Sequence, residues 1–298
     1  MSAIEEFQSA IQGVATKVGP SVVGIGRHQR GSGVVIADGK VLTNAHNVRG
    51  EQVTVTFADG RSTAGRLAGI DVDGDLAVID VDTAGATPLA WGAGDGLATG
   101  AAVFGAAASP SGGTRVTFGT VSAVARAFRG PGGRRIGGSV EHTAPLAPGS
   151  SGGPIVDAKG GFLGLNTNRL GEGFYLALPA DAALRARVDA LGSGERVERP
   201  RLGVAIAPAH VASRLRKSVG LPERDGLLVR DVEDGSPAAR AGIAQGDLIV
   251  AVAGKAITDP DELVEAIASA GDSYEVRIVR GTEERTVTVG GAAATGEA

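Results

Sequence analysis

The stretch Gly149-Ser150-Ser151-Gly152-Gly153-Pro154 is the most informative part of this chain of 298 residues. Glycines lack a Cβ atom and allow left-handed or closely approached backbone that other residues resist. Such a loop can turn successive backbone N–H groups toward one point beside the Ser151 hydroxyl, where an oxyanion would be stabilised. The alternative is a flexible Gly/Ser linker. The apolar residues Ala144 and Leu146 before the loop, and the strand-like Ile155-Val156 after it, favour the catalytic interpretation.

The composition indicates a β-rich globular protein. Hydrophobic residues make up 43% of the chain and charged residues 21%, which allows a sizeable core, and 48 glycines suit turns between short strands. A net charge of −4 gives no indication of nucleic-acid binding. Because the chain has no cysteine, disulfides, thiolate catalysis and Cys-type zinc sites are excluded. We expect no cofactor, no metal and no nucleic-acid partner.

The termini and the hydropathy pattern bear on location. No run approaches the roughly 18 apolar residues of a membrane helix, so no membrane span is expected. The first residues lack the basic start and apolar core of a signal peptide. The sequence as written therefore predicts a cytoplasmic protein, or an extracytoplasmic, periplasmic one if a leader has been removed.

The spacing of apolar residues divides the chain into two domains. Residues 4–18 have helical spacing, and short β-type runs follow up to about Leu178, a pattern typical of a sandwich or barrel. A helix is expected over 180–191. The strands expected in this first part are 22–25, 33–36, 41–43, 52–57, 76–79, 102–104, 114–124, 155–156, 162–167 and 173–178.

A smaller domain follows the first. The polar segment 193–200 is predicted to be a linker. Strands and two helices over 201–290 predict an α+β domain, with the second helix capped near Asp259. Residues 291–298 are expected to be a disordered tail.

A serine nucleophile needs a base, and the base needs an orienting partner. His46 lies where the chain turns after an apolar strand, one of four histidines in the sequence. Asp75 precedes the run Leu76-Ala77-Val78-Ile79, so its carboxylate is expected inside, where an imidazole N–H can satisfy it. The order His46, Asp75, Ser151 is that of chymotrypsin-type triads. We therefore predict these three residues as catalytic.

Two other interpretations fail on position. The acidic run from Asp71 could suggest a calcium loop, but Leu76 stands where that loop needs glycine and Asp82 where it needs glutamate. The pattern G-x-S-x-G also occurs in the elbow of α/β-hydrolases, where a helix follows the serine and the histidine comes last. Here Pro154 and a strand follow, and the only later histidine, His210, lies in the other domain.

Motifs along nearly the whole chain resemble the trypsin-like proteases of the HtrA (high-temperature requirement A, Deg) family. The resemblance implies a mainly β fold: a chymotrypsin-like double β-barrel protease domain over 1–192 with its site between two six-stranded barrels, then a PDZ domain over 201–290. The motifs are Pro20-Ser21-Val22-Val23, Gly31-Ser32-Gly33-Val34, Leu42-Thr43-Asn44-Ala45-His46, Asp75-Leu76-Ala77-Val78, Gly119-Thr120-Val121-Ser122, the nucleophile loop, Leu202-Gly203-Val204, Gly235 to Gly242, and Gly246-Asp247-Leu248-Ile249.

The resemblance implies roles for further residues of the protease domain. Backbone N–H groups of Gly149, Ser151 and Ser150 are expected to form the oxyanion hole. The substrate pocket is expected to include Pro145, Leu146, Asn166 and Thr167. Pro145 stands six residues before the nucleophile, where trypsin-like enzymes place a specificity aspartate, so cleavage after small or medium apolar residues is expected.

The resemblance also implies regulation and assembly. C-terminal peptides are expected to bind the PDZ domain at Arg201, Leu202, Gly203 and Val204 and beside a helix bearing Leu263 and Ile267. The alternatives are that the helix residues pack in the core and that Arg201 is a solvated linker charge. The segment 126–138, with Arg126, Arg129, Arg134 and Arg135, aligns with a sensor loop between protease and PDZ domains; the alternative is a solvated mobile loop. A homotrimer is expected, with Ile4 and Phe7 as candidate contacts; the alternative is that these two residues pack within the same chain.

The sequence departs from the family pattern beside the nucleophile. His142-Thr143-Ala144 stands where Thr-Asp-Ala is usual, and Ala147 and Ser150 replace asparagines. We expect an ATP-independent serine endopeptidase of protein quality control that cleaves unfolded or damaged proteins and peptides. The alternative is a catalytically idle, chaperone-like scaffold that binds peptides.

Overall fold

The computed structural model describes residues 2–92, 94–130, 135–171, 173–194 and 201–290. The chain divides into two compact units, Met1–Val197 and Glu198–Ala298. Each unit has its own sheets and core, and each is described by itself. The described residues exclude Arg134, the whole expected tail 291–298, and residues 195–200 of the expected linker.

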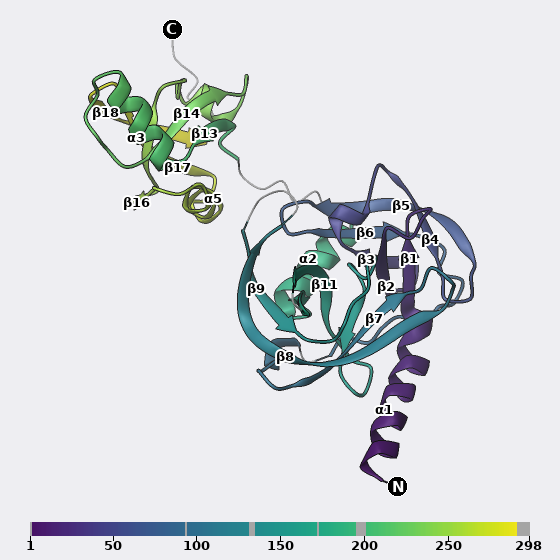
Figure 1. The fold of residues 1–298 in the computed structure, drawn as a ribbon. Helices are drawn as coiled ribbons and strands as arrows, with labels where there is room; N and C mark the ends of the chain where they lie inside the picture. Colours follow the sequence, from purple (N-terminus) through teal and green to yellow (C-terminus); the bar gives the residue numbers. More distant parts are fainter. Residues whose placement is uncertain (1, 93, 131–134, 172, 195–200, 291–298) are drawn as a thin grey trace. The chain divides into compact units, whose positions relative to one another are not determined.

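The first barrel of unit 1 is built from the first part of the chain. Its strands are β1 Val22–Ile25, β2 Gly31–Ala37, β3 Lys40–Thr43, β4 Gln52–Thr56, β5 Ser62–Asp71 and β6 Leu76–Asp80. They close in the order β1-β2-β3-β6-β5-β4 (Figure 1). The barrel is filled mainly by valine and isoleucine, with Phe57 beside them, as the alternation of apolar residues along each strand dictates.

The second barrel repeats this plan. Its strands are β7 Ala102–Ala108, β8 Thr114–Arg129, β9 Arg135–His142, β10 Pro154–Val156, β11 Phe162–Gly171 and β12 Phe174–Pro179. They close in the order β10-β11-β12-β9-β8-β7. The expected pair of six-stranded barrels is confirmed.

Two strands of the barrels were not expected from the sequence. Strand β5 mixes polar residues, glycine and alanine with only two larger apolar residues, and its three buried residues include two glycines. In β9 arginine and glycines interrupt the apolar pattern. Both owe their strand form to pairing with neighbours on each side, because tertiary pairing decides weak β propensity.

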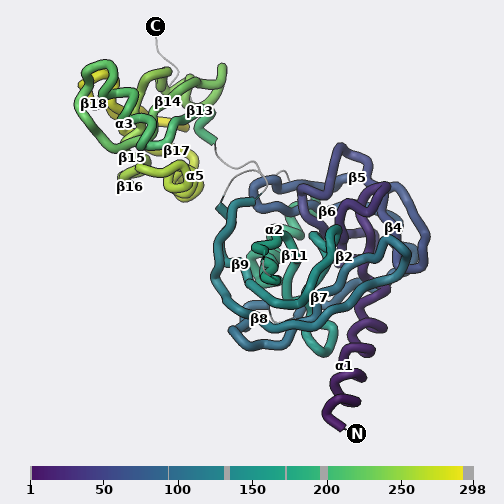
Figure 2. Tube along the Cα trace, viewed as in Figure 1, coloured from purple at the N-terminus to yellow at the C-terminus, as the bar shows by residue number. Residues whose placement is uncertain are grey.

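The expected sensor loop over 126–138 is shorter than predicted. Strand β8 continues to Arg129, and β9 already begins at Arg135, so the two strands form a long antiparallel pair with several register shifts. Figure 2 shows this pair curving around the second barrel. The arginines Arg126, Arg129 and Arg135 therefore lie on strands.

Two helices frame unit 1. Helix α1, Ala3–Val18, begins at a capping box in which Ser2 and Glu5 satisfy each other's backbone N–H groups. It buries Val14 and Val18, and its N-terminal part extends from the barrels (Figure 1). Helix α2, Ala182–Gly192, is capped by Asp181 and packs on β5 and β6. The described part of the unit also contains short 3₁₀ helices: η1 Gly19–Ser21, η2 Ala45–Asn47 and η3 Gly94–Gly96.

Unit 2 is a sheet covered by helices. Its strands are β13 Val204–Ala207, β14 Leu227–Val232, β15 Leu248–Val252, β16 Lys255–Ala256, β17 Ser273–Arg280 and β18 Glu283–Gly290. They run in the order β13-β14-β15-β17-β18, with β16 paired to β15, so β13 is an edge strand. The helices are α3 Ala209–Ser218, α4 Pro237–Arg240 and α5 Pro260–Ser269.

Helix α5 starts where the sequence predicts. Asp259 caps it, and the backbone N–H of Asp259 donates in turn to the Glu262 carboxylate. Two helices were expected in this unit and three are present, because the four-residue α4 is too short to leave a periodic pattern. No helix in the described part of the chain is long and apolar enough to cross a membrane.

Candidate active site

Asp75 is fully buried at the turn between β5 and β6, where its backbone takes a φ of 55°. Its carboxylate accepts hydrogen bonds from His46 Nδ1, 2.9 Å from each oxygen, and from Thr167 Oγ1 at 2.6 Å. The backbone N–H of His46 adds a longer bond of 3.2 Å. A buried carboxylate needs such donors, and these donors fix the orientation of the imidazole.

His46 lies on η2, directly after β3, with a side chain 29% exposed. The amide of Asn44, at the start of this turn, donates to the Asp75 carbonyl oxygen at 3.0 Å and holds the two segments together. Because Nδ1 faces a carboxylate, Nδ1 carries the proton of the neutral ring. Nε2 is therefore left as the basic nitrogen.

Ser151 lies between the two barrels, with its loop tied to both. Its carbonyl oxygen accepts from Ser32 N at 2.8 Å and from Asn47 Nδ2 at 2.9 Å, both from the first barrel. Its hydroxyl donates to the carbonyl oxygen of Thr167, on β11, at 3.0 Å. Although both side chains are described, Ser151 and His46 share no hydrogen bond in this structure.

The residues before the nucleophile form a type II turn. Ser150 N donates to Ala147 O at 3.2 Å, Pro148 occupies the second position, and Gly149 the third with a φ of 86°. The Ser150 N–H therefore already donates to an acceptor inside the turn, and its expected role as a donor in the oxyanion hole is not supported. Within the described residues, the N–H groups of Gly149 and Ser151 donate to no protein acceptor. These two remain available to an oxyanion.

The glycines after the nucleophile are required by close packing. A Cβ on Gly152 would lie 2.1 Å from the carbonyl oxygen of Ser32, and one on Gly153 would lie 2.2 Å from that of Ala106. Both contacts are backbone and cannot move aside. The glycine-rich sequence therefore lets the loop lie against both barrels, which the linker interpretation does not explain.

A cavity of about 150 Å³ opens beside Ser151 on the second barrel. Leu146, Asn166 and Thr167 line it, as the sequence resemblance implies, whereas Pro145 is exposed and lies outside the lining. Of the described residues, none that lines the cavity carries a carboxylate. The full lining is Leu146, Ala147, Pro148, Gly149, Ser150, Ser151, Asn166, Thr167, Asn168, Arg169 and Tyr175.

His142, on β9, supports this cavity from behind and was not predicted as a site residue. Its ring stacks on Tyr175, with centroids 5.8 Å apart, and its Nε2 lies 2.9 Å from Asn166 Oδ1. Burial lowers the pKa of His142 to about 4, against a smaller opposing effect of the Asn166 bond. The imidazole is therefore neutral at physiological pH. Only the pairing of β9, β11 and β12 brings these three side chains together.

In unit 2, the expected peptide-binding residues differ in their surroundings. Gly203 takes a φ of 78°, and its carbonyl oxygen accepts from Glu233 N at 3.0 Å. Arg201 is exposed and forms an ion pair with Glu233 at 3.1 Å. Leu202, Leu263 and Ile267 are buried in the unit's core, whereas Val204 is only partly buried. Val204 on the edge strand thus offers more surface to a ligand than the helix residues do.

The expected sensor arginines are held by strands. Arg126 Nε forms an ion pair with Glu141 at 3.3 Å, and Glu141 also accepts from Ser122 Oγ at 2.9 Å. Arg129 and Arg135 face each other in the β8–β9 register. No group of metal-binding side chains occurs in the part of the chain that the structure describes.

Residues 31–165 match the family model for a trypsin-like peptidase domain, and residues 228–280 match that for a PDZ domain. Among curated proteins, HhoA of Synechocystis sp., provisionally named a serine protease, is 36% identical over 279 residues. These residues span 87% of this chain and 70% of HhoA. "Serine protease Do-like HtrA" of Bacillus subtilis is 31% identical over 86% of this chain and 62% of its own length.

A further relative and two solved structures agree. The "Probable periplasmic serine endoprotease DegP-like" of Halomonas elongata is 34% identical, over 88% of this chain and 56% of its own length. The chain thus spans between about half and 70% of these relatives. The solved "HtrA-type protease AlgW with decapeptide" has a TM-score of 0.72 at 26% identity, covering 94% of this chain and 97% of its own. The serine endoprotease from Yersinia pestis has a TM-score of 0.69 at 26% identity, covering 94% and 96%.

Proposed function

Because the chain belongs to the HtrA/Deg family of trypsin-like serine proteases that carry a PDZ domain, we propose that it is an ATP-independent endopeptidase of unfolded or damaged proteins. The observation that carries this proposal is the bond between His46 Nδ1 and buried Asp75, beside the glycine-ringed Ser151. This arrangement equips His46 Nε2 to act as a base toward the serine.

The reaction would follow the serine-protease sequence. Ser151 Oγ attacks the peptide carbonyl, and His46 Nε2 takes its proton and returns it to the leaving amine. Asp75 holds the imidazole tautomer and stabilises the imidazolium. The backbone N–H groups of Gly149 and Ser151 receive the oxyanion. Water then attacks the acyl carbonyl while His46 takes the proton of the water, and His46 returns that proton to Ser151 Oγ as the acyl group leaves.

The resting hydroxyl must leave its present partner first. Ser151 Oγ donates to the Thr167 carbonyl oxygen, which lies at the rim of the substrate cavity. A substrate main-chain N–H bound along β11 would compete for that carbonyl. Losing this acceptor would free the hydroxyl to bond His46, so substrate binding itself would complete the triad.

Cleavage after small or medium apolar residues is the specificity that the cavity supports. Its volume of about 150 Å³ suits such side chains, and Leu146 and Ala147 give it apolar walls. Its described lining has no carboxylate to hold a lysine or arginine. A peptide library cleaved efficiently only after lysine or arginine would contradict this specificity.

We further propose that C-terminal peptides regulate the enzyme through unit 2. The peptide would add as a strand to the free edge of β13, with its carboxylate at the loop 201–204. Capture would reorder the segment 126–138 and through it the oxyanion hole. Deleting residues 201–298 should abolish activation by peptides, and unchanged activation would refute the regulation.

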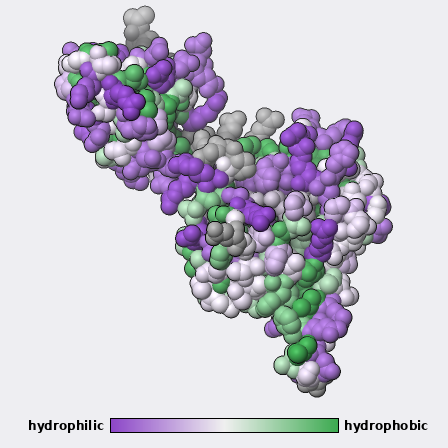
Figure 3. All heavy atoms as spheres, viewed as in Figure 1, coloured by the Kyte–Doolittle hydropathy of each residue, from purple (hydrophilic) through white to green (hydrophobic). Residues whose placement is uncertain are grey.

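Self-association as a trimer is supported by an apolar surface on α1. Ile4 and Phe7 are 78% and 44% exposed. The Phe7 ring packs edge-to-face on the exposed Phe118, with the ring centroids 4.8 Å apart. Figure 3 shows hydrophobic side chains along this helix and the adjoining barrel surface. Such patches mark interaction sites. Light scattering that gives one 29.6 kDa subunit would exclude the trimer.

An extracytoplasmic location fits better than the cytoplasmic one expected from the N-terminus. Relatives from Halomonas elongata and Brucella suis are named periplasmic endoproteases, and the cytoplasmic expectation finds no such support. Fractionation of the source cells, with antibody detection of the chain, decides between the two compartments.

Unfolded casein tests the proposed activity directly. The wild type should degrade casein without ATP, and Ser151→Ala should not. The alternative function, an idle scaffold, predicts that both proteins bind unfolded casein and that neither cleaves it. The intact triad disfavours that alternative, because binding alone requires none of its three residues.

A further inference from the structure

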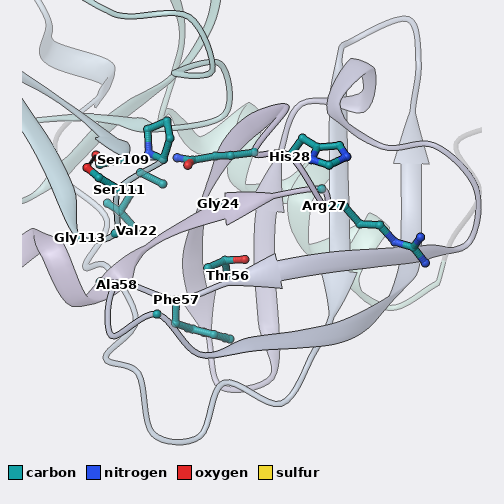
Figure 4. Close-up of a pocket in the computed structure, with 16 residues that line it drawn as sticks. Val22, Gly24, Arg27, His28, Thr56, Phe57, Ala58, Ser109, Ser111 and Gly113 are labelled. Atoms are coloured by element: carbon teal, nitrogen blue, oxygen red, sulfur yellow. Dashed lines mark hydrogen bonds between the residues drawn. The ribbon is translucent and has the colours of Figure 1, made fainter.

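Two grooves flank the turn that joins β1 to β2 on the first barrel. One, of about 580 Å³, runs toward the β7–β8 turn, with Arg27 and His28 near one end and Ser109 and Ser111 near the other (Figure 4). The second, of about 570 Å³, lies between the same turn and the segment after His46. The second groove is lined by Gly26, Arg27, His28, Arg30, Asn47, Arg49, Gln52, Val53 and Thr54.

The second groove, here called the basic groove, has positive charge and no negative charge. Arg27, Arg30 and Arg49 line it, and all three are exposed. Among the residues that the structure describes, no aspartate or glutamate lines either groove. Within the described residues, none of the three arginines has an acidic ion-pair partner. On a chain of net charge −4, this concentration of unpaired cations favours an anionic occupant.

The walls of the basic groove are tied to the nucleophile. Asn47, the residue after the catalytic-base candidate His46, lines the groove and donates to the Ser151 carbonyl oxygen at 2.9 Å. On the other wall, Arg30 directly precedes β2. In that strand Ser32 Oγ donates to the Gly149 carbonyl oxygen at 2.8 Å. A substrate peptide that extends from Ser151 over the first barrel would therefore enter the basic groove.

The reaction determines which half of the substrate lies there. The side chain before the scissile bond enters the cavity beside Ser151, which is lined only by residues of the second barrel. The amine that leaves must receive its proton from His46, which belongs to the first barrel. The leaving half of the substrate therefore runs past His46, toward Asn47 and Arg49.

We propose that Arg27, Arg30 and Arg49 bind carboxylates of the substrate on the leaving-group side, so that bonds followed closely by aspartate or glutamate are cleaved preferentially. This inference rests on the proposed protease function. Guanidinium groups suit the role because they stay charged and present several N–H donors to a carboxylate.

Quenched fluorescent peptides test the preference. The peptides share one sequence up to a valine at the scissile bond and carry Glu-Glu, Gln-Gln or Lys-Lys at the second and third positions after it. An exposed ion pair contributes about two- to fivefold, so kcat/KM for the Glu-Glu peptide should exceed that for the Lys-Lys peptide by about tenfold. The ratio should shrink between about 50 mM and 500 mM salt, because salt screens exposed charges.

Charge reversal tests the arginines themselves. Arg27→Glu/Arg30→Glu/Arg49→Glu should invert the ratio, and the milder substitution of all three by glutamine should bring it close to one. Lys159→Glu/Arg214→Glu/Lys217→Glu changes the net charge equally at exposed residues outside both grooves, and it should keep the wild-type ratio. Equal kcat/KM for the three peptides, or an unchanged ratio in both groove variants, would overturn the inference.

A binding measurement separates this inference from the proposed function. Labelled Glu-Glu and Lys-Lys peptides are titrated with Ser151→Ala protein and followed by fluorescence anisotropy. If the wild type cleaves neither casein nor any peptide, the protease function fails, while tighter binding of the Glu-Glu peptide, lost on arginine reversal, still supports an acidic-segment groove. Equal binding of both peptides refutes the groove whatever the cleavage result.

Discussion

Thr167 joins the nucleophile and the acid of the candidate triad: its carbonyl oxygen accepts from Ser151 Oγ at 3.0 Å, and its hydroxyl donates to Asp75 at 2.6 Å. One residue of β11 therefore restrains both ends of the triad. The two groups can be separated experimentally, because substitution removes the hydroxyl and leaves the carbonyl in place.

Thr167→Val should lower activity while retaining the fold. The substitution removes a donor from a fully buried carboxylate, and a hydrogen bond to a charged group contributes about 1.5–3 kcal/mol. Kinetics with a fluorogenic peptide should show kcat/KM reduced by about ten- to a hundredfold. Thr167→Ser retains a hydroxyl and should keep most of the activity. Equal losses in both variants would show that the hydroxyl is not what matters.

Gly149→Ala should act on kcat. An alanine at a φ of 86° is strained by about 1–2 kcal/mol, and its Cβ would lie 3.2 Å from the Gln29 carbonyl oxygen. Relief of that strain would turn the Gly149 N–H away, and loss of one oxyanion donor costs about a hundred- to a thousandfold in kcat. Gly100→Ala, with a φ of 91° and open space around it, is the control. The control should lose similar stability and keep its kcat; a similar kcat for Gly149→Ala and wild type would contradict the role of Gly149.

The stability of unit 1 should depend on His142 between pH 4 and 6.5. The folded protein holds the pKa of His142 at about 4 because the ring is buried, whereas the unfolded chain has an ordinary pKa of 6.5. Within this window the unfolded state binds more protons, so stability rises with pH: this contribution is complete above pH 6.5 and lost below pH 4. At about 1.4 kcal/mol per pH unit, it amounts to about 3 kcal/mol.

His142→Gln removes this titration, and denaturant unfolding at several pH values measures the change. The variant should show a flatter rise of unfolding free energy from pH 4 to 6.5. His210→Gln changes an exposed histidine of unit 2 and should keep the wild-type slope. An identical slope in wild type and His142→Gln would contradict the assignment.

Arg280→Met should loosen unit 2. Asp247 is fully buried, and its carboxylate accepts from Arg280 Nε at 2.7 Å and from Nη2 at 2.8 Å. Removing the arginine leaves the buried carboxylate with Ala244 N as its remaining described donor. Because Arg280 is partly exposed, the expected loss is about 1–3 kcal/mol. Hydrogen exchange should rise in β15 and β17 and stay unchanged in the barrels; Arg277→Met, on the same strand and paired with Glu284 near the surface, should change exchange little.

Local sequence was sufficient for many elements of the fold. Helix α1, strand β1 and the capped start of α5 appear where apolar spacing and capping residues place them. The strands β5 and β9 escaped prediction because their own residues have weak strand preference and depend on neighbours from other parts of the chain. The same dependence converted most of the expected loop 126–138 into paired strands.

The candidate triad could be proposed from the sequence because its chemistry needs particular residue types in a particular order, and glycines around a serine have few other uses. His46, Asp75 and Ser151 were predicted this way. In the structure His46 contacts Asp75, and the loop of Ser151 is bonded to Asn47, the residue after His46. The sequence alone thus determined which residues to examine, and its resemblance to the HtrA family indicated the protease fold and the PDZ domain.

Only the tertiary structure decided the geometry around those residues. It placed the Ser150 N–H inside a turn, left Pro145 outside the cavity, and brought His142, Asn166 and Tyr175 together behind it. It also gathered Arg27, Arg30 and Arg49 into one groove beside the nucleophile. The physical reason is that hydrogen-bond partners, burial and charge clustering depend on distances between strands far apart in the chain, and these distances are set by how the barrels close.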